Sequence, residues 1–244
     1  MRTMTIIRAM KSTGLLNSPL YLALAVTLGS SARAQSEEPT LVRVEEDWVA
    51  LIAEPDTATS SPQILNVISP RTDVSAVFGM VQINHRGFPA FQEGGLQVQG
   101  WNGSLFVKAM QVNKSATLYR TSDRIQYTIA MEKVTDGIKF ELLNGSSRTW
   151  GRFAQTPVAV TLPTNISGLD GYSPDFSVSS SGVNLGAHRV DLLYITAVRS
   201  AFSNGQTVTD GTDRVIHRYN ISVEDVPLAE YEQNVDEYNV DITE

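Results

Sequence analysis

Apolar and polar residues alternate with a period of two along most of this chain. Within residues 124–134, four apolar side chains occupy every second position: Ile125, Tyr127, Ile129 and Met131. Such alternation is typical of a β-strand with one face in the core and the other in water. The alternation resumes after Asp136-Gly137, a dipeptide that favours tight turns, so the sequence predicts a β-hairpin with these two residues in its turn.

Residues 190–198 are apolar on both faces. A strand with this pattern must be covered on both sides, so we expect it between two layers. Shorter alternating stretches lie at 75–84, 95–101, 206–210 and 215–222, separated by Gly, Asn, Asp and Pro. Together they predict an all-β fold, a two-sheet antiparallel sandwich over residues 41–222. We expect its core to contain Tyr127, Ile129, Phe140, Leu142, Leu192 and Tyr194.

The first 34 residues have the pattern of a secretory signal peptide. A basic start precedes a short apolar run, and small residues follow at Ala32 and Ala34. We therefore expect cleavage between Ala34 and Gln35 and a secreted, periplasmic or cell-envelope protein. Residues 35–40 are then a linker, and no segment has the roughly 18 consecutive apolar residues of a membrane span.

The chain has a negative net charge, and its acidic residues are concentrated towards the C-terminus. The formal charge is −7, and the leader contains basic but no acidic residues, so the processed chain is more acidic still. Such a chain repels phosphate backbones, which disfavours nucleic acid as a partner. No basic residue follows Arg218, and residues 223–244 are predicted to be a flexible acidic tail.

Three segments of the chain carry a resemblance to a known family. They are the hairpin RIQYTIAMEKVTDGIKFELLNGSSRTWGRF from Arg124, the segment GAHRVDLLYITAVR from Gly186, and GGLQVQGWNG from Gly94. In strand and turn placement they resemble concanavalin A-like lectin/glucanase domains, including the laminin-G type, and uncharacterised secreted bacterial proteins of this architecture. The resemblance implies a jelly-roll sandwich whose concave sheet holds glycans, sometimes beside a calcium ion.

Neutral polar residues form a stripe that suits carbohydrate binding. Gln82 and Asn84 alternate on one predicted strand, and Gln97, Gln99 and Trp101 alternate on the next. Amides form paired hydrogen bonds with hydroxyl groups, and a flat indole ring packs against the C–H face of a sugar. The stripe is either a ligand face or a solvent-facing row of uncharged residues, because strand adjacency is not visible in the sequence.

Other chemistry has weaker support. Asp210 and Asp213 place hard oxygen ligands in one loop, which either binds Ca²⁺ or only forms a turn. The nearest paired carboxyls for glycoside hydrolysis, Glu45 and Asp47, share a face, but we interpret Glu45-Glu46-Asp47 as a solvated sheet edge. The chain has no cysteine and no metal-ligand spacing around its three histidines.

We expect from these features a non-catalytic extracellular binding module without a cofactor, directed at a glycan or another envelope component. A structural envelope or matrix protein without a small ligand is the first alternative. A glucanase-type hydrolase is the second, although the alternating acids of that branch of the family are missing here.

Overall fold

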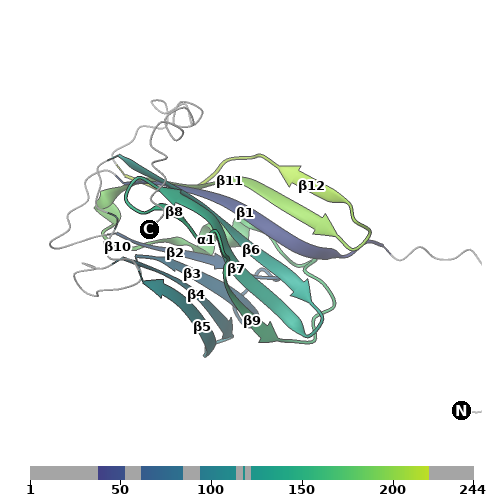
Figure 1. Cartoon of the computed structure of the whole chain (residues 1–244). Helices are drawn as coiled ribbons and strands as arrows, with labels where there is room; N and C mark the ends of the chain where they lie inside the picture. The colour runs from purple at the N-terminus through teal and green to yellow at the C-terminus, as the bar shows by residue number, and fades with distance from the viewer. Residues whose placement is uncertain (1–37, 53–61, 85–93, 114–117, 119–121, 220–244) are drawn as a thin grey trace, which may run out of the picture. The chain divides into compact units, whose positions relative to one another are not determined.

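The computed structural model describes residues 38–52, 62–84, 94–113, 118 and 122–219. Their strands form two antiparallel β-sheets that face each other as a sandwich (Figure 1). This architecture confirms the predicted fold class, and the first described strand begins at Leu41. The predicted signal peptide and acidic tail lie outside the described residues.

The larger sheet, called sheet A here, has the strand order β12-β11-β1-β6-β7-β8, with β13 also paired to β11 and β9 to β7. Its strands are β1 (Leu41–Ile52), β6 (Asp123–Val134), β7 (Gly137–Ser147), β8 (Gly151–Phe153), β9 (Val158–Pro163), β11 (Val190–Phe202), β12 (Thr207–Asp210) and β13 (Arg214–Arg218). Sheet B has the order β10-β2-β3-β4-β5. Its strands are β2 (Gln63–Ile68), β3 (Val77–Ile83), β4 (Gly95–Asn102), β5 (Leu105–Asn113) and β10 (Gly182–Leu185).

The β6–β7 hairpin forms as the alternation predicts. Every apolar residue of the β6 series is buried in the core between the sheets, as are Ile138, Phe140 and Leu142 of β7. The turn is one position earlier than expected, because Gly137 already pairs with Val134 as the first residue of β7. Thr135 and Asp136 therefore form the turn.

Strand β11 is buried on both faces, but Val190 and Val198 share the core face with Leu193 and Ile195, so its alternation is broken towards each end. Leu193 and Ile195 belong to the core between the sheets, whereas Leu192 and Tyr194 pack in a separate cluster with Val49 and Leu51. These β1 residues alternate with Trp48, Ala50 and Ile52, which face the core, so the second cluster lies on the outer face of sheet A. The assignment of Leu192 and Tyr194 to the main core is therefore wrong. Register irregularities between β1 and β11 shift the alternation.

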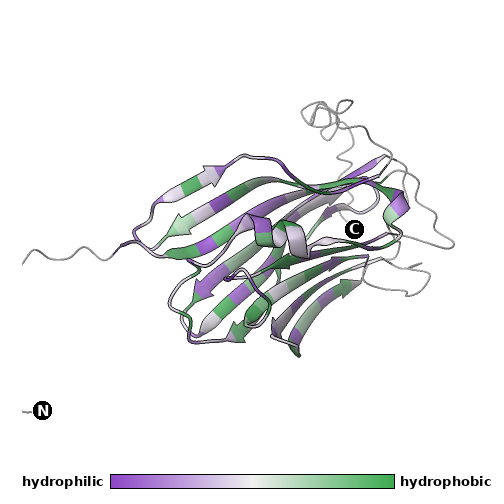
Figure 2. Ribbon diagram, turned by 180° about the vertical axis from the view of Figure 1, so that it is seen from behind, coloured by the Kyte–Doolittle hydropathy of each residue, from purple (hydrophilic) through white to green (hydrophobic). Residues whose placement is uncertain are grey.

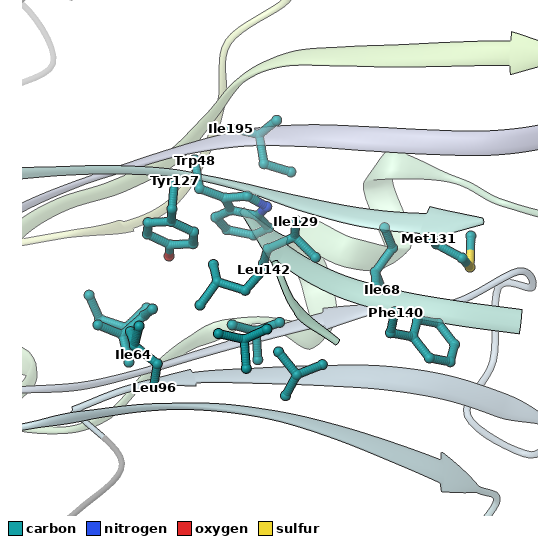
Figure 3. Packing of buried hydrophobic residues seen from close by; sticks show 14 of the residues in the cluster. Trp48, Ile64, Ile68, Leu96, Tyr127, Ile129, Met131, Phe140, Leu142 and Ile195 are labelled. Atoms are coloured by element: carbon teal, nitrogen blue, oxygen red, sulfur yellow. The ribbon is translucent and has the colours of Figure 1, made fainter. Parts of the chain in front are cut away.

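An aromatic pair stands at the centre of the core. Trp48 of β1 and Tyr127 of β6 lie on neighbouring strands with their rings parallel, 6.5 Å apart between centroids. Figure 3 shows both rings in the layer opposite Ile64 and Leu96 of sheet B. The Tyr127 hydroxyl donates a 2.9 Å hydrogen bond to Asn66 Oδ1 of β2, so a buried polar contact also joins the sheets.

One short helix interrupts the β-structure and was not predicted. Helix α1 (Pro174–Ser180) begins with Pro174 in its first turn, where a missing backbone N–H costs nothing. Seven residues are too few to show a helical hydrophobic period, which explains why the sequence pattern did not reveal it. The helix contacts β2 of sheet B together with β11 and β13 of sheet A, and Figure 2 shows it between the strands of the two sheets.

Replacement of Gly137 by alanine is expected to destabilise the protein by about 1–3 kcal/mol. A Cβ atom on Gly137 would lie 1.9 Å from the backbone carbonyl oxygen of Leu162 on β9, so the strands would have to separate. Chemical denaturation measures the change in the free energy of unfolding. Gly182→Ala is the matched control, because a Cβ at this strand start meets no atom within 4 Å. Equal stability of the two variants would contradict the close approach of β7 and β9.

Candidate functional site

Three neighbouring strands of sheet B place glutamines side by side on its outer face. Gln82 of β3 lies opposite Gln97 of β4, which in turn lies opposite Gln111 of β5. Gln99 follows Gln97 on the same face of β4, because alternate residues of a strand share a face. Leu96 and Val98 point the other way, into the core. We call Gln82, Gln97, Gln99 and Gln111 the amide row.

A chain of hydrogen bonds runs from Trp101 through three of the four glutamines, and each residue donates to the next. The Trp101 indole Nε1–H donates to Gln99 Oε1 at 2.8 Å, the Gln99 amide donates to Gln97 Oε1, and the Gln97 amide donates to Gln111 Oε1 at 3.2 Å. Each bond fixes the rotamer of the next side chain, so the amides hold a defined arrangement before any ligand arrives.

An aromatic cluster continues the amide row towards the end of β4. Trp101 stacks on Phe78 of β3 with centroids 6.1 Å apart and a 6° angle between rings. Phe106 of β5 meets Trp101 edge to face at 5.4 Å. Trp101 is partly buried and Phe106 is 48% exposed, so the cluster presents apolar ring surface to solvent.

The described side chains on this part of the outer face of sheet B are uncharged. Met80 and Ala109 lie on either side of Gln99, and neither they nor the amide row and aromatic cluster contain an ionisable group. A neutral polar surface with apolar rings beside it matches hydroxyl-rich ligands rather than charged ones.

Asn84 does not belong to this face, although the alternation along β3 predicts it. Its backbone has a φ of 58°, and its side chain is fully buried. Asn84 Nδ2 donates to the Pro62 carbonyl at 2.8 Å, and Asn84 Oδ1 accepts from the Leu118 N–H at 3.1 Å. The left-handed backbone turns the side chain inward, where its role is to satisfy buried backbone groups.

The sequence reasoning missed the contribution of β5 to the site. Gln111 and Phe106 lie on a strand that was not predicted, and Phe78 lacked a partner until the pairing of β3 and β4 was known. The Asn102-Gly103 dipeptide followed by an apolar-rich stretch was the available signal for a hairpin here.

The predicted calcium ligands are engaged by protein groups. Asp210 Oδ2 pairs with Arg214 Nη2 at 2.5 Å, and Asp210 Oδ1 accepts the Thr212 N–H at 2.9 Å. The hydrogen bonds from Thr212 and Arg214 lower the pKa of Asp210. Asp213 is exposed in the same loop. Among the described residues, no group of three or more His, Cys, Asp or Glu side chains is arranged to hold a metal ion.

The acidic run on β1 is divided between the two faces of sheet A. Glu45 and Asp47 lie on the outer face, where Arg199 of β11 pairs with both carboxylates. Strand β1 lies between β6 and β11, so the interpretation of this run as a sheet edge is wrong. The carboxyl pair considered for glycoside hydrolysis is held in ion pairs.

Glu46 points to the opposite face and is fully buried in the sandwich. Glu46 Oε1 accepts a 2.8 Å hydrogen bond from the Tyr172 hydroxyl, and Glu46 Oε2 accepts a 3.0 Å bond from Trp48 Nε1. Burial raises the pKa of Glu46 to about 7, although the nearby Ser177 and Tyr172 hydroxyls, the Trp48 indole and the charge of Arg214 oppose the shift.

A recess of about 650 Å³ opens near the loops that follow β2 and β9. Its lining includes Arg71, Asn102, Asn165 and Asp170. The Asp170 side chain is used structurally, because its Oδ1 accepts the Leu41 N–H at 2.8 Å. No member of the amide row lines this recess, so it is a separate feature of the described structure.

Comparisons with known proteins do not assign a family to the chain. No family model matches the sequence, and no curated protein matches it. Among solved structures, the chain is similar to SCP-B, a member of the eqolisin family of peptidases, in a complex with the tripeptide Ala-Ile-His. The identity is 12% and the TM-score is 0.25, over 72% of this chain and 82% of that chain. A similarity at this level carries neither family nor activity to this protein. Among the residues that the structure describes, no helix has the length and apolar character needed to span a membrane.

The stability of the protein is expected to fall as pH rises from about 4.5 to about 7, because of Glu46. This carboxyl ionises near its ordinary pKa of 4.5 in the unfolded chain and near 7 in the folded protein. Its stabilising contribution is therefore complete below pH 4.5 and is lost as pH rises past 7, a decrease of about 3 kcal/mol. Glu46→Gln keeps an amide of the same shape that accepts from Trp48 and donates to Tyr172, and we expect it to remove this pH dependence.

Urea denaturation at a series of pH values measures the effect. Glu45→Gln, on the opposite face of the same strand, is the control and should keep the decline seen in the unmodified protein. A Glu46→Gln variant with the same decline would show that the buried carboxyl is not its source.

Proposed function

We propose that this protein is a non-catalytic binding module that holds a neutral glycan on the outer face of sheet B. The observation that carries this proposal is the connected series of side chains formed by the amide row and the Phe78–Trp101–Phe106 cluster, in which Gln97 and Phe78 are buried and Gln99, Trp101 and Phe106 reach solvent. Hydroxyl groups of the ligand bond to the amides, and one pyranose ring packs against the exposed aromatic surface.

Gln99 retains capacity for a ligand after its bonds to Gln97 and Trp101 are made. A glutamine offers two N–H donors and two acceptor lone pairs, and Gln99 uses one N–H towards Gln97 and one lone pair for Trp101. Because the mutual bonds already hold the side chains in place, a ligand does not have to order each amide separately.

The resemblance to concanavalin A-like lectin domains belongs to the same proposal. The two-sheet sandwich is compatible with a jelly roll of that kind, and the signal-peptide pattern of residues 1–34 supports a role outside the cytoplasm. The proposed location, in the cell envelope or outside the cell, is where free glycans and polysaccharides occur.

The positions of the acidic residues support binding without catalysis. A glycosidase needs one carboxyl group to act as an acid and another as a base or nucleophile, both reachable from the substrate. On β1, Glu46 is buried in the core, and Glu45 and Asp47 are bound by Arg199. Among the described residues, none of the side chains that pair around Trp101 on sheet B is a carboxylate.

A glycan-array screen of the purified protein, repeated with Trp101→Ala, tests the proposal. We expect weak binding that hardly depends on salt, since neutral hydrogen bonds net only about 0.5–1.5 kcal/mol each. Loss of a stacked ring is worth about 1–2 kcal/mol by analogy with base stacking, so Trp101→Ala should weaken binding roughly 5- to 30-fold.

Tyr219→Ala is the matched control, because Tyr219 is a 41% exposed aromatic residue outside the outer face of sheet B. It should bind like the unmodified protein, and thermal unfolding should confirm that both variants are folded. Absence of any bound glycan, or equal binding by Trp101→Ala, would overturn the glycan proposal and favour a structural component without a small ligand. Release of reducing sugar from a bound polysaccharide would overturn the non-catalytic part.

A further inference from the structure

Strand β5 is an edge strand with an exposed apolar surface. Among the described strands it pairs with β4 alone and ends the order of sheet B, and Figure 1 shows it as the outermost strand of that sheet. Five of its nine residues are large apolar side chains with exposed fractions of 40–65%: Leu105, Phe106, Val107, Met110 and Val112. Its only charged residue is Lys108.

The other outer strands of the described structure are protected against pairing with another chain. Strand β10 has four residues and β8 has three, and each is too short to template a long ladder. Strand β12 has four residues and ends in Asp210, and β13 contains two arginines and a histidine. Strand β9 ends in Pro163, which lacks a backbone donor. Compared with these strands, β5 is long and apolar.

Side chains of β5 are exposed on both faces of sheet B. Met110 and Val112 lie opposite the core-facing Val98 and Leu96, whereas Phe106 lies opposite Trp101 on the outer face. A ligand held on one face of the sheet cannot cover both groups. A strand added beside β5 covers both, because its side chains also alternate between the two faces.

We propose that β5 pairs edge to edge with β5 of a second copy of this chain, forming a two-fold symmetric dimer with one continuous sheet. Antiparallel pairing of identical strands is isologous, so a single contact satisfies both copies. Each strand supplies the backbone donors and acceptors that the other lacks, together with apolar side chains on both faces.

The charge of the chain favours this edge over other surfaces for self-association. Two copies with a formal charge of −7 repel each other, and the segment from Leu105 to Asn113 contains no acidic residue. Antiparallel registers centred on Ala109 or Met110 place Lys108 opposite the partner's Met110 or Val112, which are uncharged. The contact therefore brings together the two acid-free edges without opposing like charges.

Sedimentation equilibrium of the full chain, compared with a Met110→Lys/Val112→Lys double variant, tests the dimer. We expect a dimer for the unmodified protein and at least a ten-fold weaker association for the double variant. The two added lysines of this variant lie on the β5 edge that faces the partner's β5. The side chains of Met110 and Val112 are exposed in the single chain, so the change does not disturb the core. Val208→Lys is the matched control, because Val208 is 47% exposed on the edge strand β12, and its dimer should be unchanged.

A cysteine crosslink provides a second readout that tolerates a loss of stability in the charged variant. The chain has no cysteine, so Ala109→Cys and Met110→Cys, tested separately, each place a single thiol on one face of β5. Mild oxidation should give a disulfide-linked dimer with at least one of them and none with Val208→Cys. A monomer at every concentration, a dimer unaffected by the double variant, or crosslinking by Val208→Cys alone would each overturn the proposal.

Discussion

The pairing of β1 between β6 and β11 is the constraint on which both faces of sheet A depend. Along this one strand, Val44, Trp48 and Ile52 fill the core while Glu45 and Asp47 meet Arg199 on the other face. A slip of one residue would exchange the two sets, burying ion pairs and exposing the tryptophan. The Trp48–Tyr127 stack and the Tyr127–Asn66 hydrogen bond fix the register at the centre of the strand and connect it to sheet B.

Glu46 shows how far this constraint reaches. It occupies a core-facing position that a hydrophobic residue would fill at lower cost, because burying a carboxyl requires hydrogen-bond partners. The partners come from Trp48 two positions along and from Tyr172, which precedes α1. The carboxyl therefore ties the helix-bearing segment to the central strand.

The sequence pattern predicted those parts of the fold that residues close together in the chain determine. The β6–β7 hairpin followed from alternation and a turn dipeptide within some twenty residues, and the burial of β11 followed from its two apolar faces. The face of Leu192 and Tyr194 could not be predicted, because it depends on irregular pairing with a strand at the other end of the sequence. Asn84 left its expected face through a single left-handed backbone angle.

In the candidate site, too, contacts along one strand could be predicted from the sequence and contacts between strands could not. Gln97, Gln99 and Trp101 share a face because they alternate along one strand, and the sequence shows this directly. The meeting of Gln82 with Gln97, and of Phe78 with Trp101, depends on the register between strands. The burial of Glu46 was hidden because neighbouring acids in a sequence usually indicate a solvated segment, whereas here β1 is a central strand.

The position of β1 also governs when the protein can fold. Arg199 of β11 follows its partner Glu45 by 154 positions, so β1, the first of the described strands, waits for one of the last of them. At about 5–20 residues per second, a ribosome needs on the order of ten seconds to bridge that interval. During this time the apolar face of β1 has no partner from β11, and such non-local pairing is also slow to form once the chain is complete. The nascent chain is thus kept from completing sheet A until its final strands have emerged.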